Sequence, residues 1–228
     1  MGHRERGRAA VSLTADIPTA DLERVAEATR RFLEAVGALS GADIAGPSLL
    51  PGWTVGHVLT HVARNADSHV RRAEAASRGE VIDQYPGGSG GRAAEIEAGA
   101  GRSADAILVD LVSSSAGLAS AWDRVPSDAW SRLTRDVGGH ERPLSALPGR
   151  RWQELEVHLV DLDIGVTYAD WPDEFVATWL PLVEASAPRR LPRGKAAPDA
   201  SGLDHRLRLA WLYGRAHPPG YPELASWG

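Results

Sequence analysis

The segment from Arg151 to Leu162 combines an apolar helical pattern with a seam of ionisable side chains. At about 100° per residue, its apolar residues cover most of the helix circumference, which is typical of a buried helix. Glu154, His158 and Asp161 form the polar seam. Glu154 and His158 are four positions apart, so their side chains are neighbours and can reach the same cation. Buried charges are paired or bind metal, so this seam is where we expect chemistry.

Each residue of the seam also has an ordinary structural interpretation. The Glu154–His158 pair can be an isolated surface pair that adds about 0.2–0.5 kcal/mol to helix stability. Asp161 lies one turn beyond His158. It can orient that imidazole by accepting a hydrogen bond from the ring N–H that does not face the metal, as carboxylates near metal-binding histidines do. Alternatively, it can be a surface anion. The residues alone leave both alternatives open.

A second histidine pair stands earlier in the chain. His57 and His61 are four positions apart on a predicted helix that Thr54 caps. Either histidine can be a ligand, although His61 lies nearer the apolar stripe; two solvated histidines are the alternative. Two histidines with one carboxylate form a catalytic zinc set that leaves a fourth position open. The same ligands suit other divalent ions.

Three further residues are candidates for binding or catalysis. Arg64 and Asn65 lie about one turn past His61 and face either a bound small molecule or solvent. We take them as candidate cofactor-binding residues. Arg215 follows a glycine at the end of an apolar helix, where it can cap carbonyl groups or clamp a carboxylate. The remaining histidines are expected at the surface: His3, His69, His140, His205 and His217.

Composition narrows the class of protein. The chain has 228 residues and a net charge of −5, which argues against a nucleic-acid partner. We see no apolar run near the ~18–20 residues that span a bilayer and no signal-peptide core, so we expect a cytoplasmic protein without a membrane partner. The sequence contains no cysteine. Disulfides, thiolate metal sites and a thiol nucleophile of the protein are therefore excluded, and any sulfur chemistry needs a small-molecule thiol.

Helical patterns separated by loops predict an antiparallel bundle. Residues 1–15 are predicted to be disordered, 16–168 to form the bundle, and 169–228 to form a small C-terminal subdomain. The predicted helices cover about 21–39, 54–77, 93–122, 148–167 and 203–213, with a further helix starting near 170. We expect a loop over 41–52, a small hairpin over 133–147 and a linker over 188–200.

Two segments resemble the mycothiol-dependent maleylpyruvate isomerase family, within the DinB-like metalloenzyme superfamily. They are LPGWTVGHVLTHVARNA at 50–66 and ELEVHLVDL at 154–162, and AWLYGR at 210–215 is similar to the family's C-terminal helix ending. The resemblance covers most of the chain. It implies a mainly α protein, with a DinB-like four-helix bundle and a small α/β or helical C-terminal subdomain. That subdomain is expected to be truncated, because only 188–200 stands where the family has strands.

The resemblance also implies a ligand set and a cofactor. By position, Zn²⁺ or another divalent metal is held by His61, Glu154 and His158, with His57 as a neighbour. Arg215 falls on the family's functional arginine, associated with substrate handling. The implied partners are mycothiol and a small-molecule substrate, and the implied assembly is a monomer or weak homodimer.

The function implied most directly is cis–trans isomerisation, in which the mycothiol thiolate adds to an activated cis double bond and later leaves. One alternative is a mycothiol S-transferase, for conjugation or thiol exchange in detoxification or natural-product biosynthesis. Another is a non-catalytic metal-binding bundle. Product analysis separates the first two, and a fourth protein ligand on the metal would favour the third.

Overall fold

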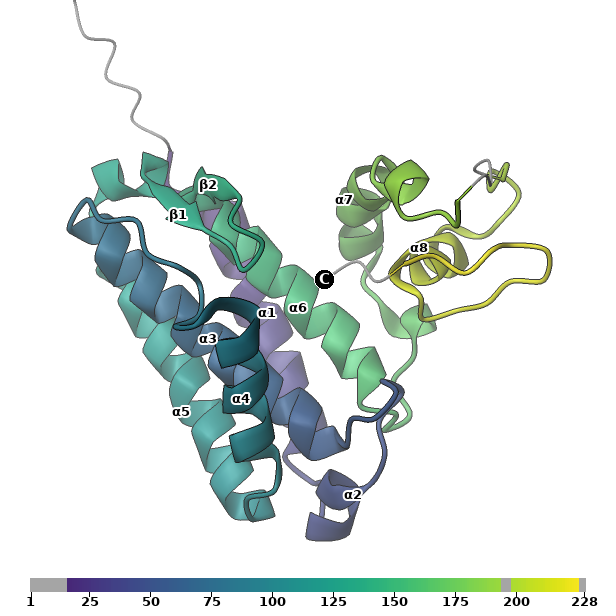
Figure 1. Ribbon diagram of the computed structural model, residues 1–228, viewed down its shortest axis with the longest axis horizontal. Coiled ribbons are helices and arrows are strands. Elements are labelled where there is room, and N and C mark those ends of the chain that lie inside the picture. Colours follow the sequence, from purple (N-terminus) through teal and green to yellow (C-terminus); the bar gives the residue numbers. More distant parts are fainter. Residues whose placement is uncertain (1–15, 194–197, 226–228) are drawn as a thin grey trace, which may run out of the picture.

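The computed structural model describes residues 16–193 and 198–225. Long helices form a bundle in which α3 packs against α5 and α6, and α1 packs against α6 (Figure 1). These four helices are α1 (Thr19–Val36), α3 (Val55–Ser77), α5 (Ala104–Asp123) and α6 (Leu147–Asp161). The described part of the chain is mainly α, which confirms the predicted fold class. The predicted disorder of 1–15 concerns residues outside the described ranges.

Helix α6 lies at the centre of the bundle. Leu155, Val157 and Leu159 are at most 4% exposed, as expected for a helix that is apolar around most of its circumference. The helix ends at Asp161, several residues before the predicted end at 167. Asp163 takes a positive φ of 57°, which lies outside the right-handed helical region, so the helix cannot continue through this residue.

The segment between α3 and α5 differs from the prediction. Instead of one helical region over 93–122, α4 (Gly88–Ala100) packs on α3, and the chain turns at Gly101 before α5. Gly99 permits this close packing, since a Cβ at this position would lie 2.4 Å from Cγ2 of Thr60 on α3. Helix α4 thereby brings its side chains to one flank of α3.

Shorter elements complete the bundle. The predicted loop over 41–52 contains a short helix, α2 (Gly41–Ala45), which Ser40 caps. The predicted hairpin is present as β1 (Leu133–Arg135) and β2 (Glu141–Pro143), paired antiparallel.

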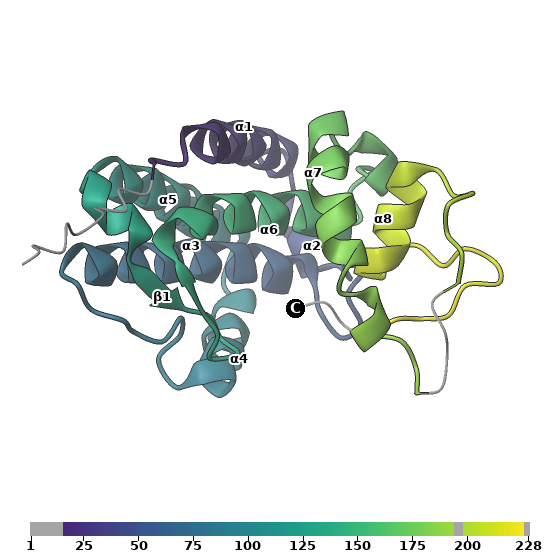
Figure 2. The ribbon, with the colours of Figure 1, turned by 90° about the horizontal axis from the view of Figure 1, so that it is seen from above.

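The C-terminal subdomain packs beside one end of α6 (Figure 2). Of the predicted subdomain 169–228, the described residues 169–193 and 198–225 contain helices and no strand, which is the second of the two predicted forms. Its elements are η3 (Tyr168–Asp170), α7 (Asp173–Glu184), η4 (Ala187–Arg189) and α8 (His205–Tyr213). Gln153 of α6 donates a hydrogen bond to the Tyr213 hydroxyl at 2.7 Å, which ties α8 to the bundle. Gly214 then takes a positive φ of 76°, so the chain reverses toward α6.

Among the described helices, α5 alone is long and apolar enough to cross a membrane by length and composition. This differs from the expectation that no apolar run approaches that length. Helix α5 packs along α3, and 33% of its membrane-length window is buried. Val109 is 65% exposed and Val112 is 52% exposed, so α5 also presents apolar side chains outward.

Candidate metal centre

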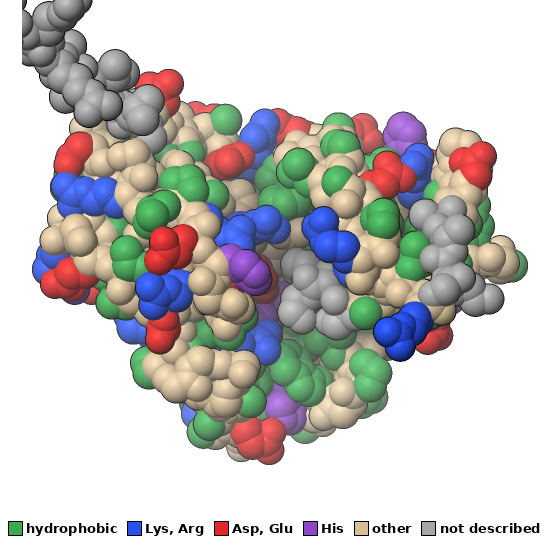
Figure 3. Space-filling view, turned by 45° about the horizontal axis from the view of Figure 1, so that its top comes forward, with side chains coloured by type: hydrophobic (Ala, Val, Ile, Leu, Met, Phe, Trp, Pro, Cys, Tyr) green, Lys and Arg blue, Asp and Glu red, His purple; other side chains and the backbone are tan. Residues whose placement is uncertain are grey.

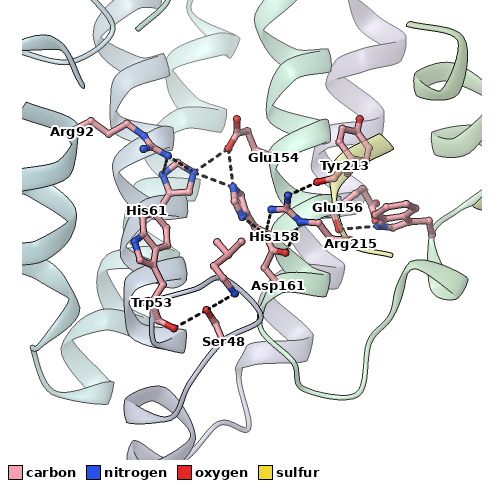
Figure 4. Close-up of polar contacts among 12 residues, drawn as sticks. Ser48, Trp53, His61, Arg92, Glu154, Glu156, His158, Asp161, Tyr213 and Arg215 are labelled. Atoms are coloured by element: carbon pink, nitrogen blue, oxygen red, sulfur yellow. Dashed lines mark hydrogen bonds and ion pairs between the residues drawn. The ribbon is translucent and has the colours of Figure 1, made fainter. Parts of the chain in front are cut away.

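The three residues predicted as metal ligands meet inside the bundle (Figure 4). His61 comes from α3, and Glu154 and His158 come from successive turns of α6. Nε2 of His61 lies 3.1 Å from Oε2 of Glu154 and 3.1 Å from Nε2 of His158. Nε2 of His158 lies 3.3 Å from the same Glu154 oxygen. The structure therefore places three potential ligand atoms at one point.

These separations fit a divalent metal. Tetrahedral bonds of about 2.0–2.1 Å place neighbouring ligand atoms roughly 3.3 Å apart, close to the observed 3.1–3.3 Å. Two imidazole nitrogens and one carboxylate oxygen are also ligand types that zinc accepts. The donor set and its spacing thus suit a metal with three protein ligands.

A buried carboxylate orients one of the imidazoles. Oδ2 of Asp161 accepts a hydrogen bond from Nδ1 of His158 at 2.8 Å, and the Asp161 side chain is fully buried. In the neutral imidazole with its proton on Nδ1, which is the form that binds a metal, the Nε2 lone pair is directed toward His61 and Glu154. Asp161 therefore has the first of its two predicted roles and is not a surface anion.

Burial and hydrogen bonding set the charges at the centre. Burial lowers the pKa of His61 to about 4, so this imidazole is neutral at pH 7. Burial disfavours an ionised Glu154, but hydrogen bonds from His158 and His61 outweigh it and hold the pKa of Glu154 well below its usual value. Burial likewise disfavours a charged His158, but Asp161 and Glu154 raise the pKa of His158. A metal that binds here would displace the proton between His158 and Glu154, because an imidazole ligand must be deprotonated at the nitrogen that binds.

His57, which the resemblance implies to be a neighbour of the metal and not a ligand, is outside the cluster of His61, Glu154 and His158. Its Nδ1 accepts a hydrogen bond from the backbone N–H of Thr54 at 3.1 Å, so the imidazole completes the cap of α3. Its Nε2 lies 3.3 Å from Oε2 of Glu97.

Arg215 reaches the centre through Asp161. Its Nε and Nη2 donate to the two oxygens of Asp161 at 2.7 and 2.6 Å, and Nη1 donates to the Tyr213 carbonyl at 2.6 Å. Arg215 therefore both caps a carbonyl group and clamps a carboxylate, and that carboxylate belongs to the protein. Asp161 links Arg215 to His158.

The structure separates the two predicted cofactor-binding residues. Asn65 is buried beside the centre, and its Oδ1 accepts a hydrogen bond from Arg151 at 2.9 Å. Arg64 faces a different direction from Asn65 on α3. Its guanidinium pairs with Asp67, one turn further along α3, at 3.1 Å and with Asp110 on α5.

A cavity of about 440 Å³ opens beside the three ligand atoms. Its lining includes Leu50, Trp53, His61, Asn65, Gln84, Tyr85, Ser89, Arg92, Val137, Glu154, His158 and Arg215. Nη2 of Arg92, from α4, lies 3.4 Å from both ring nitrogens of His61. No carboxylate pairs with Arg92 among the residues described, so its charge is available to a bound molecule.

A second cavity, of about 600 Å³, shares Asn65, Gln84 and Glu154 with the first. Figure 3 shows the hollow between the bundle and the C-terminal subdomain, with basic and histidine side chains around it. Three lining guanidinium groups have no carboxylate partner within the described ranges: Arg72, Arg150 and Arg189. Burial lowers the pKa of Arg72 to about 10, which leaves it cationic at pH 7. This cavity favours an anionic ligand.

Two features of the site were not predicted from the sequence. His69 is 2% exposed and lines the second cavity, so its predicted surface position is wrong. It continues the apolar stripe of α3, three positions past Ala66, and that periodicity is the signal that identifies it. Arg92 had no such signal, because its position depends on how α4 packs against α3.

The fold and the centre define a class: a helical bundle whose core helices direct two histidines and a glutamate at one point. The family model described as the mycothiol maleylpyruvate isomerase N-terminal domain matches residues 25–163, and the chain belongs to this family. That finding confirms the resemblance seen in the sequence.

Two solved structures share the fold. The crystal structure of the mycothiol-dependent maleylpyruvate isomerase has a TM-score of 0.81, and that of a histidine-to-alanine mutant has 0.80. Each is 24% identical in sequence, over 92% of this chain and 97% of the solved chain. No curated protein matches the sequence with significance.

Proposed function

We propose that this chain is a mycothiol-dependent zinc enzyme that isomerises a cis-unsaturated keto acid related to maleylpyruvate. The convergence of His61, Glu154 and His158 beside an open cavity, in a chain of this family, carries the proposal. The lack of cysteine supports it, since the nucleophilic sulfur must then come from a small molecule. A reduced thiol cofactor suits the cytoplasm, where we place the enzyme, as a monomer or weak homodimer.

His61, Glu154 and His158 would hold the metal. Three protein ligands leave one position for another group. When bound, zinc supplies a positive charge that favours the deprotonated form of a coordinating thiol. Asp161 keeps the Nε2 lone pair of His158 directed at the metal position, and Arg215 keeps the Asp161 carboxylate in place.

The remaining residues act on the electrophile. Addition of the thiolate to a conjugated cis double bond moves an electron pair onto the carbonyl oxygen. Arg92, and Arg215 at the other side of the cavity, can stabilise that developing charge. The former double bond then rotates as a single bond. Return of the electron pair expels the thiolate and leaves the trans isomer, so no mycothiol is consumed.

The second cavity can position the substrate. Its unpaired guanidinium groups on Arg72 and Arg150 suit a carboxylate, and Arg150 also lies over the Trp179 ring at 5.3 Å. We therefore propose that a carboxylate of the substrate extends past Glu154 into this cavity, while the double bond stays beside the metal centre.

Product analysis tests the proposal. Zinc-loaded protein is incubated with a small amount of mycothiol and a panel of cis-unsaturated keto acids and other electrophiles, and products are identified by mass spectrometry and NMR. The proposal predicts a trans product with mycothiol recovered unchanged. Stoichiometric conversion of mycothiol to a conjugate would instead identify an S-transferase. No mycothiol-dependent product from any compound would refute both and favour a non-catalytic bundle.

A further inference from the structure

A third cavity, of about 370 Å³, lies between α1 and α5, and no candidate metal ligand lines it. Its walls are mostly apolar: Leu22, Val25, Ala26 and Leu33 from α1, and Val112, Ala116, Leu118, Ala119 and Trp122 from α5. Val112 is 52% exposed, so the cavity is accessible along α5. Its volume falls within the range of about 300–1,000 Å³ that is typical of small-molecule sites.

A buried positive charge also lines this cavity. Arg151 of α6 is 1% exposed, and its Nη1 donates hydrogen bonds to the Val62 carbonyl at 2.8 Å and to Oδ1 of Asn65 at 2.9 Å. Its Nε and Nη2 are buried and have no partner among the described residues. Burial lowers the pKa of Arg151 to about 10, so the guanidinium remains charged at pH 7. A buried charge without an opposite charge is costly to a fold.

Trp122, which also lines this cavity, carries a second unsatisfied donor. Nε1 of Trp122 is buried and has no hydrogen-bond partner among the described residues. The hydroxyl of Thr29 is already used, since it donates to the Val25 carbonyl at 2.7 Å. Asp123 also belongs to the lining, but it is exposed and forms no ion pair with Arg151. The unsatisfied groups, Trp122 Nε1 with Nε and Nη2 of Arg151, are therefore all donors.

We propose that this cavity binds an amphipathic carboxylate, with its head on Arg151 and Trp122 and a medium-length alkyl chain along the walls of α1 and α5. A carboxylate has two acceptor oxygens that match the fork of a guanidinium. The alkyl chain covers apolar surface that is otherwise open to water. The site is separate from the metal centre and does not depend on the proposed isomerase activity.

Calorimetric titration of the full chain with three ten-carbon probes tests the proposal. Decanoate is expected to bind with a stoichiometry of one. Decanol, which lacks the charge, should bind at least about tenfold more weakly, because hydrogen bonds to charged groups account for a difference of that order. Decyltrimethylammonium should not bind. Arg151→Met should weaken decanoate by at least about tenfold and leave decanol unchanged.

Ala116→Trp tests the location. Ala116 is exposed on α5 and lines the cavity, so an indole there should fill the space and abolish decanoate binding. Ala106→Trp is the matched control: Ala106 is exposed on the same helix but does not line the cavity, so binding should persist. Circular dichroism confirms folding of each variant.

Three results would overturn the proposal. They are equal affinities for decanoate and decanol, undiminished binding by the Ala116→Trp variant, and no heat of binding at decanoate concentrations of about 1 mM. If Arg151→Met does not fold, the proposal is still tested by the affinities for decanoate and decanol and by decanoate binding to the Ala116→Trp and Ala106→Trp variants.

Discussion

Asp161→Asn is the substitution that tests the architecture of the centre most sharply. The Asp161 carboxylate accepts hydrogen bonds from Nδ1 of His158 at 2.8 Å and from Nε and Nη2 of Arg215 at 2.7 and 2.6 Å. Asparagine has nearly the same shape, but it offers one oxygen acceptor and an NH₂ donor. At least one of the three donors must then face another donor in a fully buried position.

The expected magnitudes follow from these contacts. Loss of a residue that hydrogen-bonds to a metal ligand, as Asp161 does to His158, typically weakens metal binding by about 10–100-fold, or roughly 1.4–2.7 kcal/mol. If the new amide donates to Nδ1, the imidazole proton moves to Nε2, and His158 no longer offers a lone pair to the metal. The Arg215 side chain is only 12% exposed. The metal-free protein should therefore also lose about 3 kcal/mol of unfolding free energy, as when a buried ion pair is broken.

Competition with a chromophoric chelator measures zinc affinity, and denaturant titration of the metal-free protein measures stability. Arg64→Gln is a suitable control, since Arg64 pairs with Asp67 and Asp110 away from the centre. It should leave zinc affinity unchanged. Zinc binding by Asp161→Asn that is as tight as in the native chain would refute the assigned role of Asp161.

Three further predictions concern the centre itself. His61→Ala, Glu154→Ala and His158→Ala should each abolish metal retention in elemental analysis, and full occupancy in all three would overturn the ligand assignment. Arg92→Met should retain zinc but lower kcat/KM by about 100-fold, the scale of one lost charge-stabilising donor; unchanged kinetics would remove Arg92 from the mechanism. Burial lowers the pKa of His61 from 6.5 to about 4, so the unfolded chain binds this proton first as the pH falls. Metal-free protein should thus lose about 3 kcal/mol of stability from His61 between pH 6.5 and 4, and a His61→Gln variant with the same pH dependence in denaturant titrations would contradict this.

Much of the centre could be predicted because its ligands follow local spacing. Glu154 and His158 are neighbours on any helix, and the apolar circumference of α6 indicates that this helix is buried. The choice between His57 and His61 needed more information. His57 lies at the third position of α3, where its ring takes part in the helix cap. The position of each histidine relative to the apolar stripe did not decide which of the two is the ligand.

The parts that could not be predicted depend on contacts between distant segments. The pairing of Arg215 with Asp161 joins residues 54 positions apart in the chain. Arg92 reaches His61 because Gly99 lets α4 approach α3 closely. Neighbours in the sequence can also be separated in the structure. Arg64 is next to Asn65, but successive helical residues face different directions, and Arg64 faces Asp110 on α5.

X-ray absorption at the zinc edge of the zinc-loaded protein tests the proposed metal centre most directly. We expect one zinc per chain, with nitrogen and oxygen ligands at about 2.0–2.1 Å and imidazole scattering from two histidines. In the His61→Ala protein that signal should be lost together with the metal. A chain that binds no stoichiometric zinc, or a ligand shell without imidazole, would contradict the proposed centre.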